Sequence, residues 1–441
     1  MTQNQFIKFA QRINSVTFSN VWIDMDQGTK YCKASFHHNQ KPRCPHCGAT
    51  GPIYDHRPVQ SSWRGLDDGT LKVVIQMDLR RITCPNCQKV VTERVPFALP
   101  SSRFTKAFEQ DIAHSALSMS KADICKKYRI NWRTVGAIVT RIREVLEPDP
   151  NSKFDHLKHI GIDETSYQKG HKYLTTVTNL ETNELIWAAP GHDSATLSRF
   201  FEQLKPEQRQ SIECVAGDGA RWIKSTVTRY CEQAIFCIDP FHVVSWCIDS
   251  MDTVRKDLWK DALSKEKKTP KRRRGRPSKK DPVPAKHSKI LNGAKYSLGK
   301  NPENLTDRQQ TKLDEIKNLY PKMFRAYQLK EALRNVFHCD TVEETEAALN
   351  YWLSWARRSQ IPSFIDLYYK IKRHKEAILN TARYGMSTSK VEAMNNKIKV
   401  IIRRSYGFGK VENLIDMVLL SCSRIGRTLV PAYKKCPGLS S

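Results

Sequence analysis

The sequence predicts a multidomain α+β protein, and three observations support this class. The chain has 441 residues, more than one hydrophobic core usually organises, so we expect two to four folding units. After residue 155 the apolar periodicity changes from helical to extended, and strand-length apolar runs begin to alternate with helical segments. Two pairs of closely spaced cysteines near the N-terminus indicate a separate small unit stabilised by a metal ion.

The N-terminal unit, residues 1–98, is predicted to bind zinc. Two Cys-x2-Cys pairs, each able to present two thiolates from one tight turn, supply the ligands Cys44, Cys47, Cys84 and Cys87. Four thiolates leave no open position for water, so this zinc would be structural. Two unrelated turns with buried thiols are the alternative. The 13 cysteines are an odd number and no secretory signal is recognisable, so a disulfide framework is not expected.

A helix-turn-helix is predicted over residues 100–147. Ser120 to Asp123 has the pattern of a capping box, and residues 128–131 form a short turn to a second helix with an apolar stripe. That helix begins with side chains suited to contacting base edges and phosphates. The predicted DNA-binding residues are Asn131, Trp132, Arg133 and Thr134. A plain helical hairpin is the alternative.

The charge balance indicates a polyanionic partner. Lys and Arg number 73 against 45 Asp and Glu, a formal net charge of +28, which favours nucleic acid. No segment approaches the roughly 20 apolar residues of a membrane-spanning helix, so we expect a cytoplasmic protein.

A basic loop is expected at residues 262–290. Residues 265–280 carry ten Lys or Arg against one Glu, a density too high to bury a core. At its centre, Arg274-Gly-Arg276-Pro277 resembles an AT-hook, whose arginines enter a narrow A·T minor groove. A solvated linker is the alternative.

Residues 156–245 predict a mixed sheet with an acidic edge. Strands are expected at 159–163, 172–180, 184–190, 212–218 and 234–239, and helices at 194–205 and 220–231. Three consecutive strands followed by alternating helices and strands is the element order of ribonuclease H-like nucleases. Three strands end in an acid, namely Asp163, Asp218 and Asp239. Ligands gather where such strands end, so an acidic site is expected there.

A helical insertion, residues 246–386, is expected to interrupt this α/β core, which resumes at 387–441. In the predicted helix 387–404, Glu392, Lys399 and Arg403 fall on one face with Asn396. That face would carry both a metal-binding acid and basic side chains that can hold a phosphate backbone. Ser389 with Glu392 also has the pattern of a capping box, and capping the helix is the alternative role of this acid.

Three segments together resemble the ISL3 family of bacterial insertion-sequence transposases. They are Gly161 to Tyr173, Asp239 to Val243, and Glu392 to Lys399 followed by Tyr406-Gly-Phe408. The cysteine pairs and the helix-turn-helix fit the same family, so the resemblance covers nearly the whole chain. It implies a DNA transposase of the DDE type, which binds the terminal inverted repeats and uses two Mg²⁺ or Mn²⁺ ions to cleave and join DNA. We further expect a homodimer or higher assembly on transposon ends and target DNA, associated with the bacterial nucleoid.

The implied catalytic acids are Asp163, Asp218 and Glu392, with Lys399 in support. The first and last match the family positions, whereas the second acid is either Asp218 or Asp239. Asp218 is preferred because it ends the fourth strand, where the ribonuclease H-like order places the second acid. Asp239-x2-His242 resembles an accessory motif found after that acid in several transposase groups. A DNA-binding regulator without catalysis and a nuclease that only hydrolyses are the alternative functions.

Overall fold

The computed structural model describes residues 1–57, 59–268, 287–385 and 389–429. The proposed AT-hook arginines, Arg274 and Arg276, lie outside these residues. The chain forms two compact units, one of residues 1–150 with 400–441 and the other of residues 151–399. The boundary at Lys399 falls inside a single helix, α16 (Ser389–Arg404).

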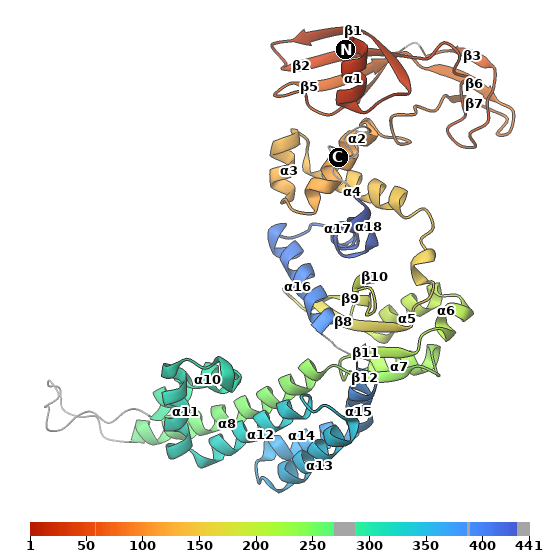
Figure 1. Ribbon diagram of the computed structural model, residues 1–441. Helices are drawn as coiled ribbons and strands as arrows, with labels where there is room; N and C mark the ends of the chain where they lie inside the picture. The colour runs from red at the N-terminus through yellow and green to blue at the C-terminus, as the bar shows by residue number, and fades with distance from the viewer. Residues whose placement is uncertain (58, 269–286, 386–388, 430–441) are drawn as a thin grey trace, which may run out of the picture. The chain divides into compact units, whose positions relative to one another are not determined.

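The first unit begins with helix α1 (Gln3–Gln11) and two small sheets (Figure 1). A four-stranded sheet has the order β1 (Val16–Asp24), β2 (Thr29–Phe36), β5 (Lys72–Met77) and β4 (Ser61–Arg64). A three-stranded sheet has the order β3 (Ile53–His56), β6 (Arg80–Cys84) and β7 (Lys89–Thr92). The strand that the alternation of residues 71–79 predicts is β5, whose side chains alternate between buried and half-buried.

Five helices complete the first unit, and the last two follow the whole second unit in sequence. They are α2 (Lys106–Ala116), α3 (Lys121–Tyr128), α4 (Trp132–Leu146), α17 (Val411–Cys422) and α18 (Arg424–Thr428). Asp416 of α17 accepts hydrogen bonds from Thr140 Oγ1 at 2.6 Å and Arg143 Nε at 2.9 Å, both on α4. The C-terminal helices are therefore part of the same compact body as the three-helix segment.

The second unit is built on a five-stranded sheet with the order β10-β9-β8-β11-β12. The strands are β8 (His159–Gln168), β9 (Lys172–Asn179), β10 (Glu184–Pro190), β11 (Cys214–Gly217) and β12 (Ile235–Ile238). The first three pair antiparallel, whereas β8, β11 and β12 run parallel. Three short helices connect these strands: α5 (Ser194–Gln203), α6 (Pro206–Gln210) and α7 (Arg221–Tyr230). The chain is therefore mixed α and β, as predicted.

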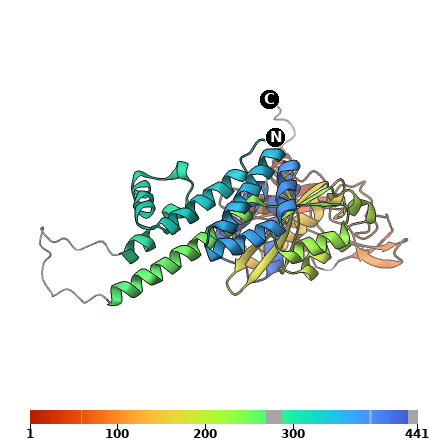
Figure 2. The ribbon, with the colours of Figure 1, turned by 90° about the horizontal axis from the view of Figure 1, so that it is seen from below.

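In the described residues between the sheet and α16, the chain forms eight α-helices. They are α8 (Pro240–Lys268), α9 (His287–Gly293), α10 (Lys295–Gly299), α11 (Asp307–Leu319), α12 (Pro321–Val336), α13 (Val342–Arg358), α14 (Pro362–Arg373) and α15 (Lys375–Arg383). The long helix α8 packs along α12 and α14, and α8 and α12 lie side by side in Figure 2 as in Figure 1. Their apolar faces continue the core on one side of the sheet. In the described residues, no helix is both long and apolar enough to cross a membrane.

Candidate active site and nucleic-acid interface

The four predicted zinc ligands converge in the first unit. All their sulfur atoms lie within 4.8 Å of one another, with Cys44 Sγ 3.9 Å from Cys87 Sγ and Cys47 Sγ 3.4 Å from Cys84 Sγ. A tetrahedral zinc ion with Zn–S bonds of about 2.3 Å requires sulfur separations of about 3.8 Å. The cluster therefore has the dimensions of a four-thiolate zinc site.

Two tight turns hold these cysteines in place. The amide of Gly48 donates to the carbonyl of Cys44 at 3.1 Å, and the amide of Gln88 donates to that of Cys84 at 2.9 Å. Both Gly48 and Gln88 have a positive φ, as such turns require. The backbone amide of Cys47 leads the interactions that lower the pKa of Cys44 to about 6, which favours the thiolate that binds metal.

The predicted DNA-binding helix begins in the expected place. Ser120 caps α3, and Asn131 caps α4 by accepting a hydrogen bond from the amide of Thr134 at 3.0 Å. Trp132 and Arg133 are exposed at the start of α4, while the apolar stripe of the helix is buried. The oxygen of the Asn131 side chain is thus used in capping, and its amide nitrogen remains as a donor.

The acidic site lies at one edge of the second unit's sheet. Asp163 lies on β8, Asp218 directly follows β11, and Asp239 directly follows β12. Together with His242 and the apolar residue Val391, these acids line one cleft, which is too narrow for a water molecule in the present side-chain arrangement. His242 Nε2 lies 4.0 Å from Asp163 Oδ1 and 3.9 Å from Asp239 Oδ2. The structure therefore brings together the three strand-end acids that the sequence singled out.

Helix α16 crosses the sheet at Asp163. Val391 packs closely on Gly161, where an added Cβ would lie 2.7 Å from Val391 Cγ2. Asn395 is buried, donates a hydrogen bond to Asp163 Oδ2 and accepts one from Thr165 Oγ1 at 2.6 Å. Glu392 is exposed, one turn before Asn395. Among the basic residues expected on this helix, Lys399 and Arg403 are also exposed.

Two residues of this site, Asn395 and Glu164, are not predicted from the sequence. Asn396 is the asparagine expected on the functional face of α16, but Asn396 is exposed and its neighbour Asn395 contacts Asp163. Glu164 is half-buried, and burial followed by the charges of Asp218 and Asp163 raises its pKa to about 7. The spacing of three residues from Glu392 was the only sequence signal for Asn395.

Electrostatics in the cleft disfavour an ionised Asp163. Burial of this carboxyl, with the charge of Asp239, raises its pKa to about 6 against the opposing effects of the Glu164 amide and His242. A cation that binds in the cleft would relieve this penalty. In the described part of the chain, the cysteine cluster is the only group of three or more potential ligands whose atoms all lie within 4.8 Å. In this side-chain arrangement, the acids of the cleft do not form a comparably tight group.

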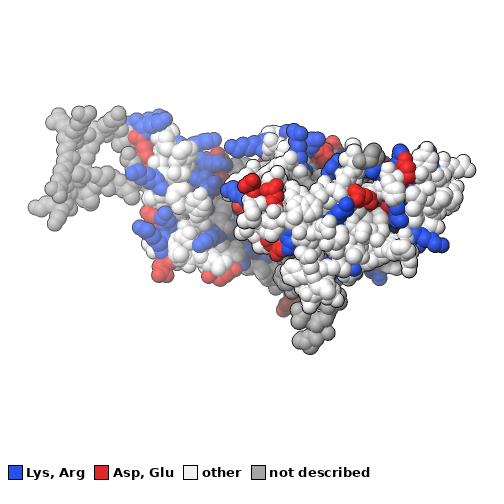
Figure 3. All heavy atoms as spheres, turned by 90° about the horizontal axis from the view of Figure 1, so that it is seen from above, with Lys and Arg blue, Asp and Glu red and all other residues white. Residues whose placement is uncertain are grey.

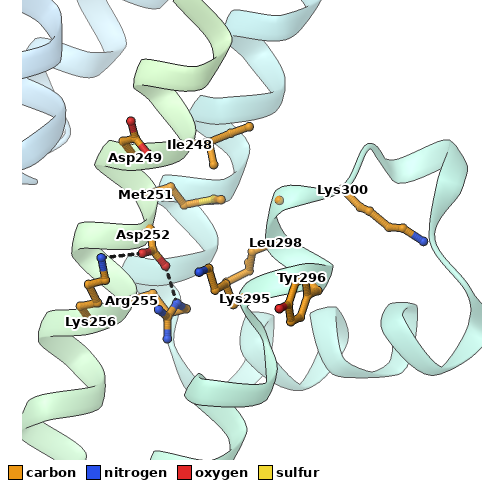
Figure 4. Close-up of a pocket in the computed structure, with 11 residues that line it drawn as sticks. Ile248, Asp249, Met251, Asp252, Arg255, Lys256, Lys295, Tyr296, Leu298 and Lys300 are labelled. Atoms are coloured by element: carbon orange, nitrogen blue, oxygen red, sulfur yellow. Dashed lines mark hydrogen bonds and ion pairs between the residues drawn. The ribbon is translucent and has the colours of Figure 1, made fainter. Parts of the chain in front are cut away.

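A separate cavity of about 520 Å³ lies between α8 and α10 (Figure 4). Asp252 lies in its wall and is already paired, with Arg255 Nε at 2.7 Å and Lys256 Nζ at 2.9 Å. The carboxylate of Asp252 is thus neutralised by two cations of its own helix.

Comparisons with known proteins agree with these features. Residues 160–418 match a family model described as "Transposase", residues 93–143 match the helix-turn-helix domain of transposase family ISL3, and residues 40–87 match the zinc-finger of transposases IS204, IS1001, IS1096 and IS1165. The first match covers more than half of the chain. The chain therefore belongs to the ISL3 family of transposases.

Curated relatives of similar length support this assignment. The chain is 42% identical over 400 residues to the transposase for insertion sequence element IS1557 of Mycobacterium tuberculosis, covering 90% of this chain and 89% of the relative. It is 27% identical over 368 residues to the transposase for IS1001 of Bordetella parapertussis, covering 83% and 85%. The protein is a DNA transposase, with a helix-turn-helix for DNA and a zinc finger whose four cysteines form a structural metal site.

Proposed function

We propose that the acidic cleft is a DDE-type active site in which Asp163, Asp218 and Glu392 hold two divalent metal ions. Strand register carries this proposal. Ala216 pairs with Gly161 at the end of the parallel ladder, and Asp218 and Asp163 each come two residues further on, Asp218 directly after β11 and Asp163 on β8. Such strands lie about 4.8 Å apart, and paired catalytic ions lie about 4 Å apart.

Glu392 is the third ligand in this proposal. Its helix is fixed against β8 by the contact of Val391 with Gly161 and by the hydrogen bond from Asn395 to Asp163. One helical turn, three residues at 1.5 Å each, separates Glu392 from Asn395 by about 4.5 Å along the axis. Asn395 is therefore assigned the role of positioning both the helix and the Asp163 carboxylate.

Carboxylate oxygens are the ligands that Mg²⁺ or Mn²⁺ prefers. When bound, these ions activate a water or a 3′-hydroxyl and stabilise the leaving oxygen of a phosphodiester. The chain contributes the ligands, a partly buried cleft and the surrounding charges that determine when Asp163 is ionised.

Asp239 with His242 is the alternative to Asp218 as the second acidic position. Gly217 pairs with Ile238, so Asp239 is also level with Asp218, but one strand further from Asp163. In the present side-chain arrangement His242 Nε2 lies within 4.0 Å of carboxylate oxygens of both Asp163 and Asp239, whereas Asp218 accepts a hydrogen bond from the amide of Ala220 at 2.6 Å. We favour Asp218 because backbone register determines which carboxylates can share two ions, and side chains can rotate.

The same proposal covers the remaining parts of the chain. The strand order of the second unit fits a ribonuclease H-like core with residues 246–386 as a helical insertion. The exposed start of α4, with Trp132 and Arg133, would read the terminal inverted repeats, and Arg403 would contact their backbone. Pairing two transposon ends calls for a homodimer or a higher assembly on DNA.

One assay separates this function from its alternatives. The purified chain is incubated with Mg²⁺, a target plasmid, and DNA ends from its own insertion sequence, either intact or pre-nicked to expose a 3′-hydroxyl. We expect cleavage of intact ends and joining of pre-nicked ends to the plasmid. Cleavage without joining would identify a hydrolytic nuclease, and binding without either product would identify a regulator. The Asp163→Ala and Glu392→Ala variants should bind ends but give no product.

A further inference from the structure

Beside Asp218, an aromatic side chain of α8 lies directly against the backbone. A Cβ added at Gly219 would lie 2.4 Å from Cη2 and 2.5 Å from Cζ2 of Trp246. No other residue fits at position 219 without displacing this ring. The ring of Trp246 is therefore fixed next to the loop that carries Asp218.

The same indole ring supports a lysine from α14. Lys370 Nζ lies 3.6 Å from the centroid of the Trp246 ring, a short cation–π contact. Burial lowers the pKa of Lys370, whereas the charges of Asp218 and Asp249 act in the opposite direction. Lys370 is thus close enough to Asp218 for their charges to interact, and it is held on the ring that packs against Gly219, the residue after Asp218.

Three further cations lie close enough to His374 for their charges to act on it. Arg221 and Lys224 on α7 and Arg373 on α14 are exposed, and their charges, with that of Lys370, lower the pKa of His374, whose burial has the larger effect. His374 itself packs on Trp246, with ring centroids 5.5 Å apart. Arg221, Lys224, Lys370 and Arg373 form what we term the basic patch.

The basic patch has no internal counter-charge. Within the described ranges of the chain, none of its four side chains forms an ion pair or donates a side-chain hydrogen bond, although the charges of Asp218 and Asp249 act on Lys370. On the face shown in Figure 3, Lys and Arg lie in several groups among Asp and Glu. An unpaired group of cations beside acidic residues is suited to a ligand of opposite charge.

We propose that the basic patch binds DNA backbone phosphates next to the scissile phosphate, with Lys370 as a positioning residue held by Trp246. This inference rests on the proposed active site and identifies how the substrate strand is held there. Without bound ions, the carboxylates of the cleft repel a phosphodiester, so cations beside the cleft are needed to draw the strand towards it. A phosphate contact is also the means by which proteins fix the register of DNA.

A chemical double-mutant cycle tests this contact. In Lys370→Met, an unbranched apolar side chain can still pack on Trp246 but the charge is lost. Each phosphate within three positions of the cut is replaced in turn by a neutral methylphosphonate. We expect at least about a tenfold loss of cleavage for Lys370→Met on native DNA, the size expected for a charge-assisted contact, and no further loss when the contacted phosphate is already neutral. Lys370→Arg should restore most of the activity.

Lys372→Met is the matched control, because Lys372 lies on the same helix with its Nζ 5.9 Å from the centroid of another aromatic ring, that of Tyr368. It should cleave like the wild type on every substrate. The contact is ruled out if Lys370→Met and the methylphosphonate lower cleavage independently at every position tested, so that their effects multiply. It is also ruled out if Lys370→Met and Lys372→Met lose equal amounts of cleavage. If the wild type cleaves and Lys370→Met cleaves equally well, only this inference fails. If the wild type does not cleave, the proposed active site fails first.

Discussion

The raised pKa of Asp163 makes a quantitative prediction about metal dependence. Because metal ions bind the ionised carboxylate, protons compete with them below the pKa of about 6. At pH 5 only about one tenth of the Asp163 carboxyls would be ionised, compared with nearly all at pH 7.5. The metal concentration for half-maximal cleavage should therefore rise about tenfold between pH 7.5 and pH 5. Because burial raises the pKa of Asp163, metal-dependent cleavage is lost as the pH falls through about 6.

This prediction is measured with pre-nicked ends at saturating DNA, by titrating Mn²⁺ at each pH and recording the half-maximal concentration. End binding is followed by fluorescence anisotropy at the same pH values, so that a change in affinity for DNA is not mistaken for metal competition. An aspartate with an ordinary pKa of 3.8 would change the half-maximal concentration by less than about a tenth over this range. A pH-independent value would refute the inference that burial controls this carboxylate.

Three further predictions concern the scaffold. Elemental analysis should find one tightly held zinc per chain. The Cys84→Ser variant should lose this zinc, and its first hundred or so residues should become sensitive to protease. A zinc-free wild-type chain that resists protease would contradict this prediction. Gly161→Ala should destabilise the second unit by about 1–3 kcal/mol through overpacking against Val391, whereas Gly299→Ala, where an added Cβ meets nothing within 4 Å, should leave the melting temperature nearly unchanged. Asp416→Ala removes the acceptor of two hydrogen bonds from α4. Thermal denaturation should therefore show a loss of about 1–3 kcal/mol in the free energy of unfolding, and the variant should bind transposon ends more weakly. Wild-type stability and binding would exclude a structural role for α17 in that unit.

The sheet of the second unit could be predicted closely from the sequence because its strands are short apolar runs that end at turns or acids. Strands expected at 184–190 and 234–239 correspond to Glu184–Pro190 and Ile235–Ile238. The first strand was expected to end at Asp163 but continues to Gln168. Its extra residues pair with β9 in a polar hairpin, and polar residues carry no apolar alternation from which a strand could be predicted.

The contacts that complete the cleft could not be predicted, because they depend on which elements meet in space. Asn395 looks like any solvated residue of an amphipathic helix until α16 is placed against β8. The same holds for Trp246, which marks an apolar helical face in the sequence and contacts Gly219 only because α8 starts at the edge of the sheet. An apolar stripe predicts that a face is buried, but it does not identify the partner.

The assignment of the second acid is the central claim, and one comparison tests it most directly. Asp218→Ala and Asp239→Ala are assayed with Mg²⁺ on the protein's own pre-nicked ends, and binding to those ends is measured in parallel. Phosphate contacts elsewhere supply most of the affinity, so both variants should bind like the wild type. We predict that Asp218→Ala gives no cleavage or joining, whereas Asp239→Ala retains measurable activity. Activity in Asp218→Ala with none in Asp239→Ala would contradict the assignment and place the second metal ligand on β12.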